Sequence, residues 1–325
     1  MMGLISCYSE LAVQVSEKSS CSSYKNVSNS VNSNSVNSNS VSPNLTPSIQ
    51  TAVTNVYKTT LSTGDRHVIT VTWCRNSTVH GLHINSGNDP TTGFRLNTST
   101  RLFRKKKGNK MFEINNSKFE VFYDLSTAVY GAGAGAEPVE GYYVVVIVDS
   151  ELVLFLGDMS EEAAVKKVKI NKQIVNSDLV SRREHFSGNG FYATKVKFSG
   201  AGSWHDVLIR CTGDDDGVKN PSLSVCIDKR VVVRVKRLRW NFRGNQTIFV
   251  DGLQVDLMWD VHDWFFSSGS EPGSGSGYGS GCGSGRAVFM FRRRNGLDSR
   301  LWLEDEVKRK DEKQEFSLLV YANRS

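Results

Sequence analysis

No apolar run in this sequence approaches the roughly 18–20 residues that a membrane-spanning helix requires. The longest such run, Tyr142 to Val148, has only the length of a strand. The first ten residues lack a basic segment ahead of an apolar stretch, so they do not predict a secretory signal. We therefore expect no transmembrane segment and an intracellular location, cytoplasmic or nuclear, with membrane-peripheral placement as a further possibility.

The sequence also lacks the common signatures of catalytic, metal and cofactor sites. No G-x-S-x-G elbow, phosphate-binding Walker loop or H-E-x-x-H motif occurs. No two of the six cysteines form a C-x-x-C pair, and their scatter favours reduced thiols rather than a zinc site. We expect no catalytic residue, no metal ligand, no cofactor and no enzymatic activity. The strongest enzymatic alternative is Asp260 with His262, which share one face of a strand.

What the chain does contain is enough apolar material for a folded core. Of its 325 residues, 39% are hydrophobic and 10% aromatic, and the net charge is +7. This composition excludes a wholly disordered protein and fits one large domain or two ordinary ones. The positive charge favours an anionic partner without identifying it.

Two stretches have the composition of flexible segments. Residues 24–54 are rich in Ser and Asn and repeat SVNSN, so we interpret them as a disordered linker after an N-terminal segment, 1–23. Residues 267–285 are mainly Gly and Ser and predict a mobile loop.

The remainder alternates like a β protein. Apolar and polar residues alternate from His67 to Trp73. Tyr142–Val148 is a continuous β-branched or aromatic run, and Val231–Val235 is β-branched apart from Arg234. We interpret both runs as strands buried on both faces. Only the segment after Asp158 resembles a helix, because acidic residues precede basic ones as the helix dipole favours. We therefore predict a short helical connector over 159–190.

An internal repeat suggests two related units. Residues 108–125 align without a gap with residues 244–261, and the alignment keeps strand parity. The hairpin turn pairs also match, Asn115-Asn116 with Asp251-Gly252. We predict an all-β fold of two homologous tandem antiparallel modules, 55–158 and 191–325. Each would be a sandwich or small barrel, unless both halves form one larger pseudo-symmetric sandwich.

Basic residues cluster at equivalent places in the two copies. Thr91–Phe112 and Lys229–Arg243 contain no acidic residue. Such cations could hold phosphates, while Trp240 and Phe242 could stack on a base or lie at a lipid surface. The alternative is a structural role without a ligand, in which Lys and Arg side chains keep exposed strand edges from pairing with other strands. The candidate anion-binding residues are Arg101, Arg104, Lys105, Lys106, Lys107, Lys110, Arg234, Lys236, Arg237, Arg239 and Arg243.

Several segments together resemble a plant family, the domain-of-unknown-function 868 proteins. The resemblance lies in SCYSELAVQVSEKSSCSS, TVTWCRN, LFRKKKGNK, VSRREHF, RWNFRGNQT and VDLMWDVHDWFF. It implies a plant source and supplies no catalytic or binding residue. It also implies a Trp in the first basic hairpin where this chain has Arg104.

These observations lead to a function hypothesis with alternatives. We predict a non-enzymatic binding or scaffold module whose basic hairpins contact an anionic partner, either acidic lipid head groups or nucleic acid. The alternative is a protein–protein adaptor that presents sheet edges and has no anionic ligand.

Overall fold

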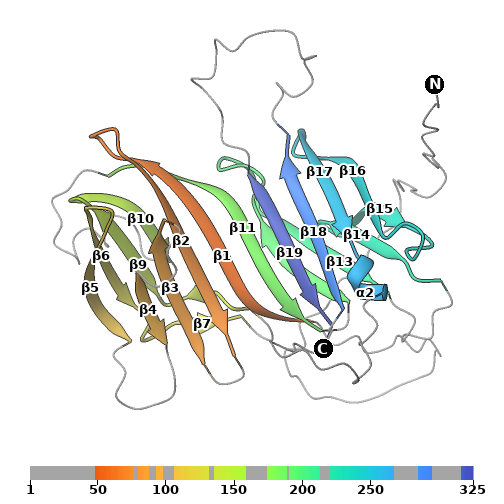
Figure 1. The fold of residues 1–325 in the computed structure, drawn as a ribbon, viewed down its shortest axis with the longest axis horizontal. Coiled ribbons are helices and arrows are strands. Elements are labelled where there is room, and N and C mark those ends of the chain that lie inside the picture. The colour runs from red at the N-terminus through yellow and green to blue at the C-terminus, as the bar shows by residue number, and fades with distance from the viewer. Residues whose placement is uncertain are drawn as a thin grey trace, which may run out of the picture.

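The fold of this protein consists almost wholly of strands (Figure 1). The computed structural model describes residues 48–76, 79–87, 93–97, 106–131, 135–158, 174–188, 190–212, 220–266, 285–294 and 316–324. Within these ranges one short helix, α2 (His262–Phe266), accompanies the strands. The prediction of an all-β protein is confirmed.

The largest sheet runs through the whole molecule. Its nine strands lie in the order β16-β17-β18-β19-β11-β1-β2-β3-β4, and all neighbours are antiparallel except β11 and β19. The strands are β1 (Ile49–Thr60), β2 (Arg66–Arg75), β3 (His80–Ser86), β4 (Phe94–Asn97), β11 (Ser177–Ser187), β16 (Arg243–Val250), β17 (Leu253–Asp260), β18 (Arg286–Arg293) and β19 (Ser317–Asn323).

Two four-stranded sheets and a two-stranded ribbon complete the described fold, and none of these sheets is closed. The first sheet has the order β10-β9-β6-β5, with β5 (Lys107–Ile114), β6 (Ser117–Asp124), β9 (Tyr143–Val148) and β10 (Glu151–Gly157). The second has the order β12-β13-β14-β15, with β12 (Phe191–Val196), β13 (His205–Cys211), β14 (Leu223–Ile227) and β15 (Arg230–Val235). The ribbon pairs β7 (Val129–Tyr130) with β8 (Pro138–Glu140).

Each four-stranded sheet packs against one end of the nine-stranded sheet. The first core combines side chains of β1–β4 with side chains of β5, β6, β9 and β10, including Trp73 and Val146. The second core combines β12–β15 with β16–β19, including Val225 and Phe289. Apolar side chains alternate along each strand and so lie on one face of its sheet. Burial of these faces against each other packs the sheets into two layers.

The two continuous apolar runs behave differently. Every residue of β9 is buried, and Val145 and Ile147 pack on the face opposite the first core. This strand is therefore buried on both faces, as predicted. In β15, by contrast, Val233 is buried while Arg234 is exposed, so the prediction that this strand is buried on both faces is wrong.

The predicted linker and connector both need correction. Residues 49–54, placed in the disordered linker, belong to β1. Residues 177–187, placed in the helical connector, form β11, because Val180, Glu184 and Phe186 turn inward with the even period of a strand. Residues 1–47 and 159–173 lie outside the described residues, so the N-terminal segment, most of the linker and the expected helix do also.

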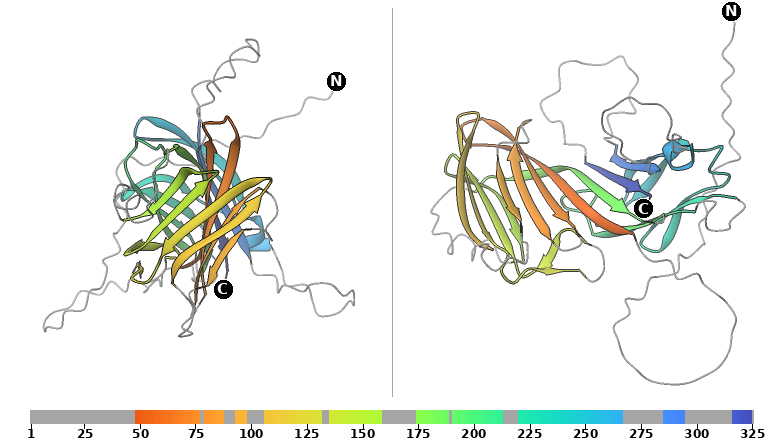
Figure 2. Two further views of the ribbon diagram at one scale, coloured as in Figure 1. Left: turned by 90° about the vertical axis from the view of Figure 1, so that its left-hand side faces the viewer. Right: turned by 60° about the horizontal axis from the view of Figure 1, so that its bottom comes forward.

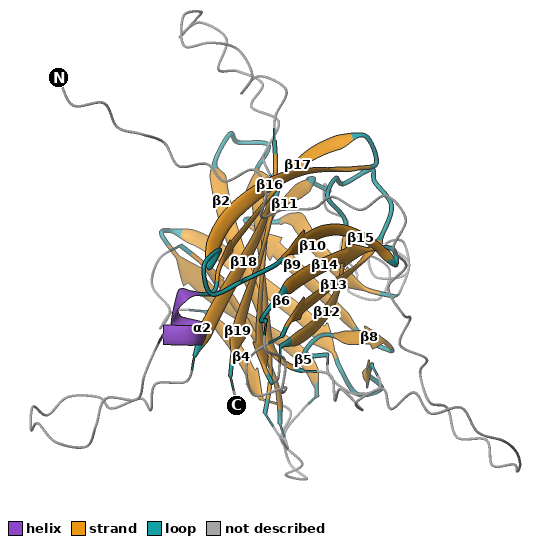
Figure 3. Ribbon diagram, turned by 90° about the vertical axis from the view of Figure 1, so that its right-hand side faces the viewer, coloured by secondary structure: helices purple, strands orange, loops and turns teal. Residues whose placement is uncertain are grey.

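Strand β11 joins the two halves of the molecule. It pairs with β1 of the first half and with β19 of the second. The right-hand view of Figure 2 shows the remaining strands grouped on either side of β1 and β11, and Figure 3 shows α2 beside β18 and β19 of the second half. The two halves therefore share one sheet.

The cysteines follow the sequence expectation only in part. Cys74 and Cys211 are reduced cysteines, the first exposed and the second buried. Cys226, however, is disulfide-bonded. The expectation of reduced cysteines is wrong at this residue.

Candidate functional site

The segment between β15 and β16, residues 236–242, is a tightly held loop that we call the Trp240 loop. Leu238 is fully buried, and its N–H donates to the Pro221 carbonyl at 2.9 Å. The Trp240 N–H donates to the Arg237 carbonyl at 2.9 Å, and Asn241 Nδ2 donates to the Lys236 carbonyl at 3.1 Å. These bonds fix the backbone, so the loop has a defined shape.

This loop presents an indole and several cations to solvent. Trp240 is 84% exposed, the highest value among the large hydrophobic residues that are described. Lys236, Arg237 and Arg239 are exposed around it. Arg237 has a positive φ of 51°, which reverses the chain between the two strands.

The base of the loop is packed rather than open. Phe242 contacts the second core, and its ring lies 5.3 Å from His262 and 5.8 Å from Phe266 of α2. The Arg243 guanidinium lies 5.7 Å from the centre of the Phe242 ring. Trp259 Nε1 donates to the Asn241 carbonyl at 2.9 Å. Phe242 is therefore a supporting residue, and Trp240 is the aromatic side chain that the loop offers outward.

Asp260 holds the strand end and α2 together. Its Oδ2 accepts a hydrogen bond from Arg243 Nε at 2.8 Å, and its Oδ1 accepts one from the His262 N–H at 3.0 Å. Partial burial would raise the pKa of Asp260, but these bonds hold it below its usual value. The His262 ring bonds to Asp263 rather than to Asp260. Both carboxylate oxygens of Asp260 thus serve the local structure.

The basic residues predicted in the first half lie at the other end of the molecule. Lys106, Lys107 and Lys110 are exposed on or beside β5, and Lys107 forms an ion pair with Asp124 at 3.3 Å. The nine-stranded sheet ends at β4 on this side and at β16 on the side of the Trp240 loop. The two basic regions therefore do not form one patch. Arg101, Arg104 and Lys105 lie outside the described residues.

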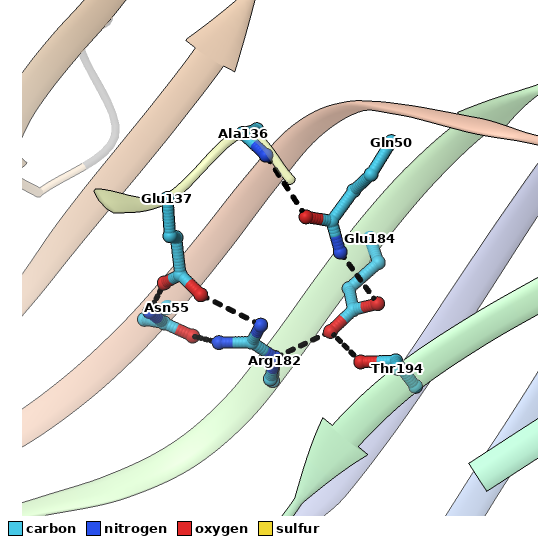
Figure 4. A network of polar contacts seen from close by, with 7 residues as sticks. All are labelled: Gln50, Asn55, Ala136, Glu137, Arg182, Glu184 and Thr194. Carbon is cyan, nitrogen blue, oxygen red and sulfur yellow. Dashed lines mark hydrogen bonds and ion pairs between the residues drawn. The ribbon is translucent and has the colours of Figure 1, made fainter. Parts of the chain in front are cut away.

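A buried polar network, which the sequence analysis did not predict, lies between the two halves (Figure 4). The Arg182 guanidinium donates to Glu137 at 2.7 Å and to Asn55 at 3.2 Å, and it also binds the fully buried Glu184. Glu184 further accepts from Gln50 at 2.9 Å and from Thr194 at 2.6 Å. Each charge in the network has a partner of opposite sign.

The network links strands of both halves. Gln50 and Asn55 come from β1, Arg182 and Glu184 from β11, and Thr194 from β12. Burial together with Glu137 raises the pKa of the nearby Tyr142 to about 12. A signal was present in the sequence, because Arg182 and Glu184 share strand parity with the apolar residues Val180 and Phe186. It was missed because this segment was assigned to a helix.

A second polar cluster ties two turns of the second half together. The His205 ring bonds to Asp228 at 2.6 Å through Nδ1 and to Asp251 at 2.9 Å through Nε2. Burial alone would lower the pKa of His205, but the bonds and charges of the two aspartates raise it overall. We call these three residues the His205 clamp. It lies at the end of β15 away from the Trp240 loop.

Comparison with known proteins places this architecture in a family. A family described as plant protein of unknown function (DUF868) matches residues 48–324. The chain belongs to this family. No curated protein matches the chain, and no solved structure matches it. The DUF868 match takes in the strands of both halves, the Trp240 loop and the buried network. It begins after residues 6–23, where part of the resemblance was seen.

Proposed function

We propose that this protein is a non-enzymatic binding module that docks on acidic membrane surfaces through the Trp240 loop. The observation that carries the proposal is the exposed indole of Trp240 on a loop whose backbone is fixed by hydrogen bonds. Indole rings favour the boundary between lipid head groups and hydrocarbon, and neighbouring cations attract anionic lipids. A fixed loop also loses little conformational entropy when it binds.

The packing of Phe242 favours a membrane over single-stranded nucleic acid. Proteins that bind single strands stack successive bases on several aromatic faces. Here Phe242 is held against the second core and α2, which leaves Trp240 as the free face of the loop. One indole surrounded by cations matches an interfacial anchor better than a stacking track.

Binding to lipid vesicles tests the proposal. The full chain is sedimented with neutral vesicles and with vesicles containing phosphatidylserine or phosphoinositide, across a salt series. We expect binding to the acidic vesicles alone and weaker binding at high salt. Because each cation near an acidic surface contributes about 1 kcal/mol, changing Lys236, Arg237 and Arg239 to Ser should weaken binding about 100-fold.

The second half offers a matched control for the indole. Trp204 is also exposed, at 64%, and lies beside His205 at the other end of the module. Trp240→Ala should weaken vesicle binding, while Trp204→Ala should leave it unchanged. Equal effects of the two substitutions would contradict docking by the loop, and binding of single-stranded nucleic acid in place of vesicles would favour the other anionic partner.

We also propose that the two halves descend from one duplicated sandwich unit. The pairing order of β1–β4, β5, β6, β9 and β10 is repeated by β12–β19. The ion pair Lys107–Asp124 has its counterpart in Arg243–Asp260, and Asn115 and Asp251 both take positive φ in the hairpin turns. These correspondences support a common ancestor. In this view β11 is an added strand that fuses the two units.

The proposed location is intracellular and membrane-peripheral. Imaging of a tagged chain would test it. Retention at a membrane that depends on Trp240 is the expected result, and a secreted chain would contradict it. The disulfide at Cys226 is the observation that runs against a reducing compartment.

A further inference from the structure

Strand β16 forms an open edge of the nine-stranded sheet. It pairs with β17 on one side and is the last strand of the sheet on the other. The Phe242 carbonyl accepts the Val261 N–H at 2.8 Å, and a two-residue turn joins Val250 to Leu253. Because bonded and non-bonded pairs alternate along an antiparallel ladder, the even-numbered residues of β16 bond to β17. Those of odd number direct their backbone groups outward.

These outward groups are free in the described part of the chain, apart from one weak contact. The Thr247 carbonyl accepts a long hydrogen bond, 3.4 Å, from the Gln246 side chain through Nε2. The other outward residues are Arg243, Asn245 and Phe249. A row of unsatisfied N–H and C=O groups is a template for another strand.

The sequence of this edge lacks the protection found on its counterpart. From Gly244 to Val250 no side chain is charged, and Phe249 is 69% exposed. The equivalent strand of the first half, β5, begins with Lys107 where β16 begins with Arg243, and it carries two further exposed charges, Lys110 and Glu113. Charged side chains on an edge prevent pairing, because a partner strand would have to desolvate them. On β16 the residues that match Lys110 and Glu113 are Gln246 and Phe249, so beyond its first residue, Arg243, this edge carries no charge that would oppose pairing.

The other open edges among the described strands are short, charged or covered. Strand β4 has four residues, β12 carries Lys195, β15 carries Arg230 and Arg234, and the β10 edge accepts a hydrogen bond from the Val175 N–H.

We propose that β16 is the docking edge through which two copies of this chain pair antiparallel into one continuous sheet. In one register, Gln246 of one copy lies opposite Gln246 of the other. Arg243 of each copy then faces Phe249 of the other copy, and Asn245 faces Thr247. Each outward residue then meets an outward residue, so the backbone groups of both strands are satisfied. Arg243 covers the exposed Phe249 ring as a cation–π partner, and no like charges face each other. The strand is thus complementary to itself, as an interface with twofold symmetry requires.

The proposal is tested on the full chain in solution, without vesicles, so its outcome is independent of membrane docking. Sedimentation velocity over a dilution series should show a monomer–dimer equilibrium. Phe249→Lys places a lysine opposite Arg243 and should raise the dissociation constant at least about tenfold. Phe249→Glu places a carboxylate there instead, so this variant should still form dimers.

Two further variants keep the test decisive. Met111→Lys also replaces an exposed hydrophobic side chain with lysine, but on β5, and should leave the dimer unchanged. Asn245→Pro removes one outward N–H without touching a bond to β17 and should also weaken dimerisation. Circular dichroism checks the fold of each variant. A wild-type chain that stays monomeric, or a Phe249→Lys chain that dimerises as tightly as wild type, would overturn the proposal.

Discussion

Arg182 shows how much one residue can control in this molecule. Its guanidinium forms ion pairs with the carboxylates of both Glu137 and Glu184, and Glu184 is fully buried. Replacing Arg182 with Met leaves Glu184 without its counter-charge in a medium of low dielectric. We expect Arg182→Met to lower the free energy of unfolding by about 3–5 kcal/mol in urea denaturation.

The neighbouring Arg183 supplies the control. It is exposed on the opposite face of the same strand, so Arg183→Met should change the stability by no more than about 0.5 kcal/mol. Adding Glu184→Gln to Arg182→Met should restore part of the loss, because the stranded charge is then removed. Similar losses for Arg182→Met and Arg183→Met would mean that the network contributes no stability.

The His205 clamp predicts a specific pH dependence. The raised pKa of His205 makes its contribution complete below about pH 6.5, the ordinary value, and lost as the pH rises through the raised value. The pKa values of Asp228 and Asp251 are lowered by their bonds to His205, so their contribution is lost only as the pH falls below about 4. The clamp is therefore strongest in the mildly acidic range.

Urea denaturation at a series of pH values measures this effect. The stability difference between wild type and His205→Gln should be largest near pH 5 to 6 and should shrink toward alkaline pH. Glutamine keeps a hydrogen-bonding group but no charge, so it isolates the contribution of the imidazolium. A difference that does not vary with pH would show that His205 binds the aspartates as a neutral ring.

At the scale of single elements, the two hairpins β5–β6 and β16–β17 make a paired prediction. A Cβ added at Gly244 would lie 2.2 Å from the Trp259 ring, whose Nε1 is held by the Asn241 carbonyl. The matching Cβ at Gly108 would lie 3.3 Å from the Tyr123 hydroxyl. We expect Gly244→Ala to cost about 1–3 kcal/mol and Gly108→Ala to be nearly neutral, as measured by thermal and urea unfolding. Equal costs would contradict the close contact at Trp259.

These hairpins also show which elements the sequence was able to predict. Asn115 and Asn116, with Asp251 and Gly252, were expected to form tight turns, and all four have positive φ. Such turns are local, because two residues set the backbone geometry. The residues of β11 were wrongly assigned to a helix, because the pairing that makes them a strand is not local. Its neighbours β1 and β19 come from distant parts of the chain, and a run of acidic then basic residues nearby indicated a helix.

The candidate site was predictable in composition but not in geometry. The basic residues of the Trp240 loop and the aromatic character of Trp240 followed from the sequence. The exposure of Trp240 and the burial of Trp259 and Trp264 did not, because these depend on which strands face each other. The Arg182 network was beyond reach for the same reason, since Gln50 and Glu184 meet across 134 positions of sequence.

At the scale of the whole molecule, the shared sheet predicts that the two halves unfold as one unit. Ile69 is fully buried in the first core, so Ile69→Ala should cost about 2–5 kcal/mol. Because β11 pairs with β1 and β19 at once, this loss should reach the second half. Amide hydrogen exchange of the most protected residues in β17 and β18 should then accelerate by the factor that corresponds to the measured loss in stability. The matching substitution in the second core, Val207→Ala, should accelerate exchange in β9 in the same way. If either substitution accelerated exchange only in its own half, the halves would be independent units, and the central strands would serve as a hinge rather than a continuous sheet.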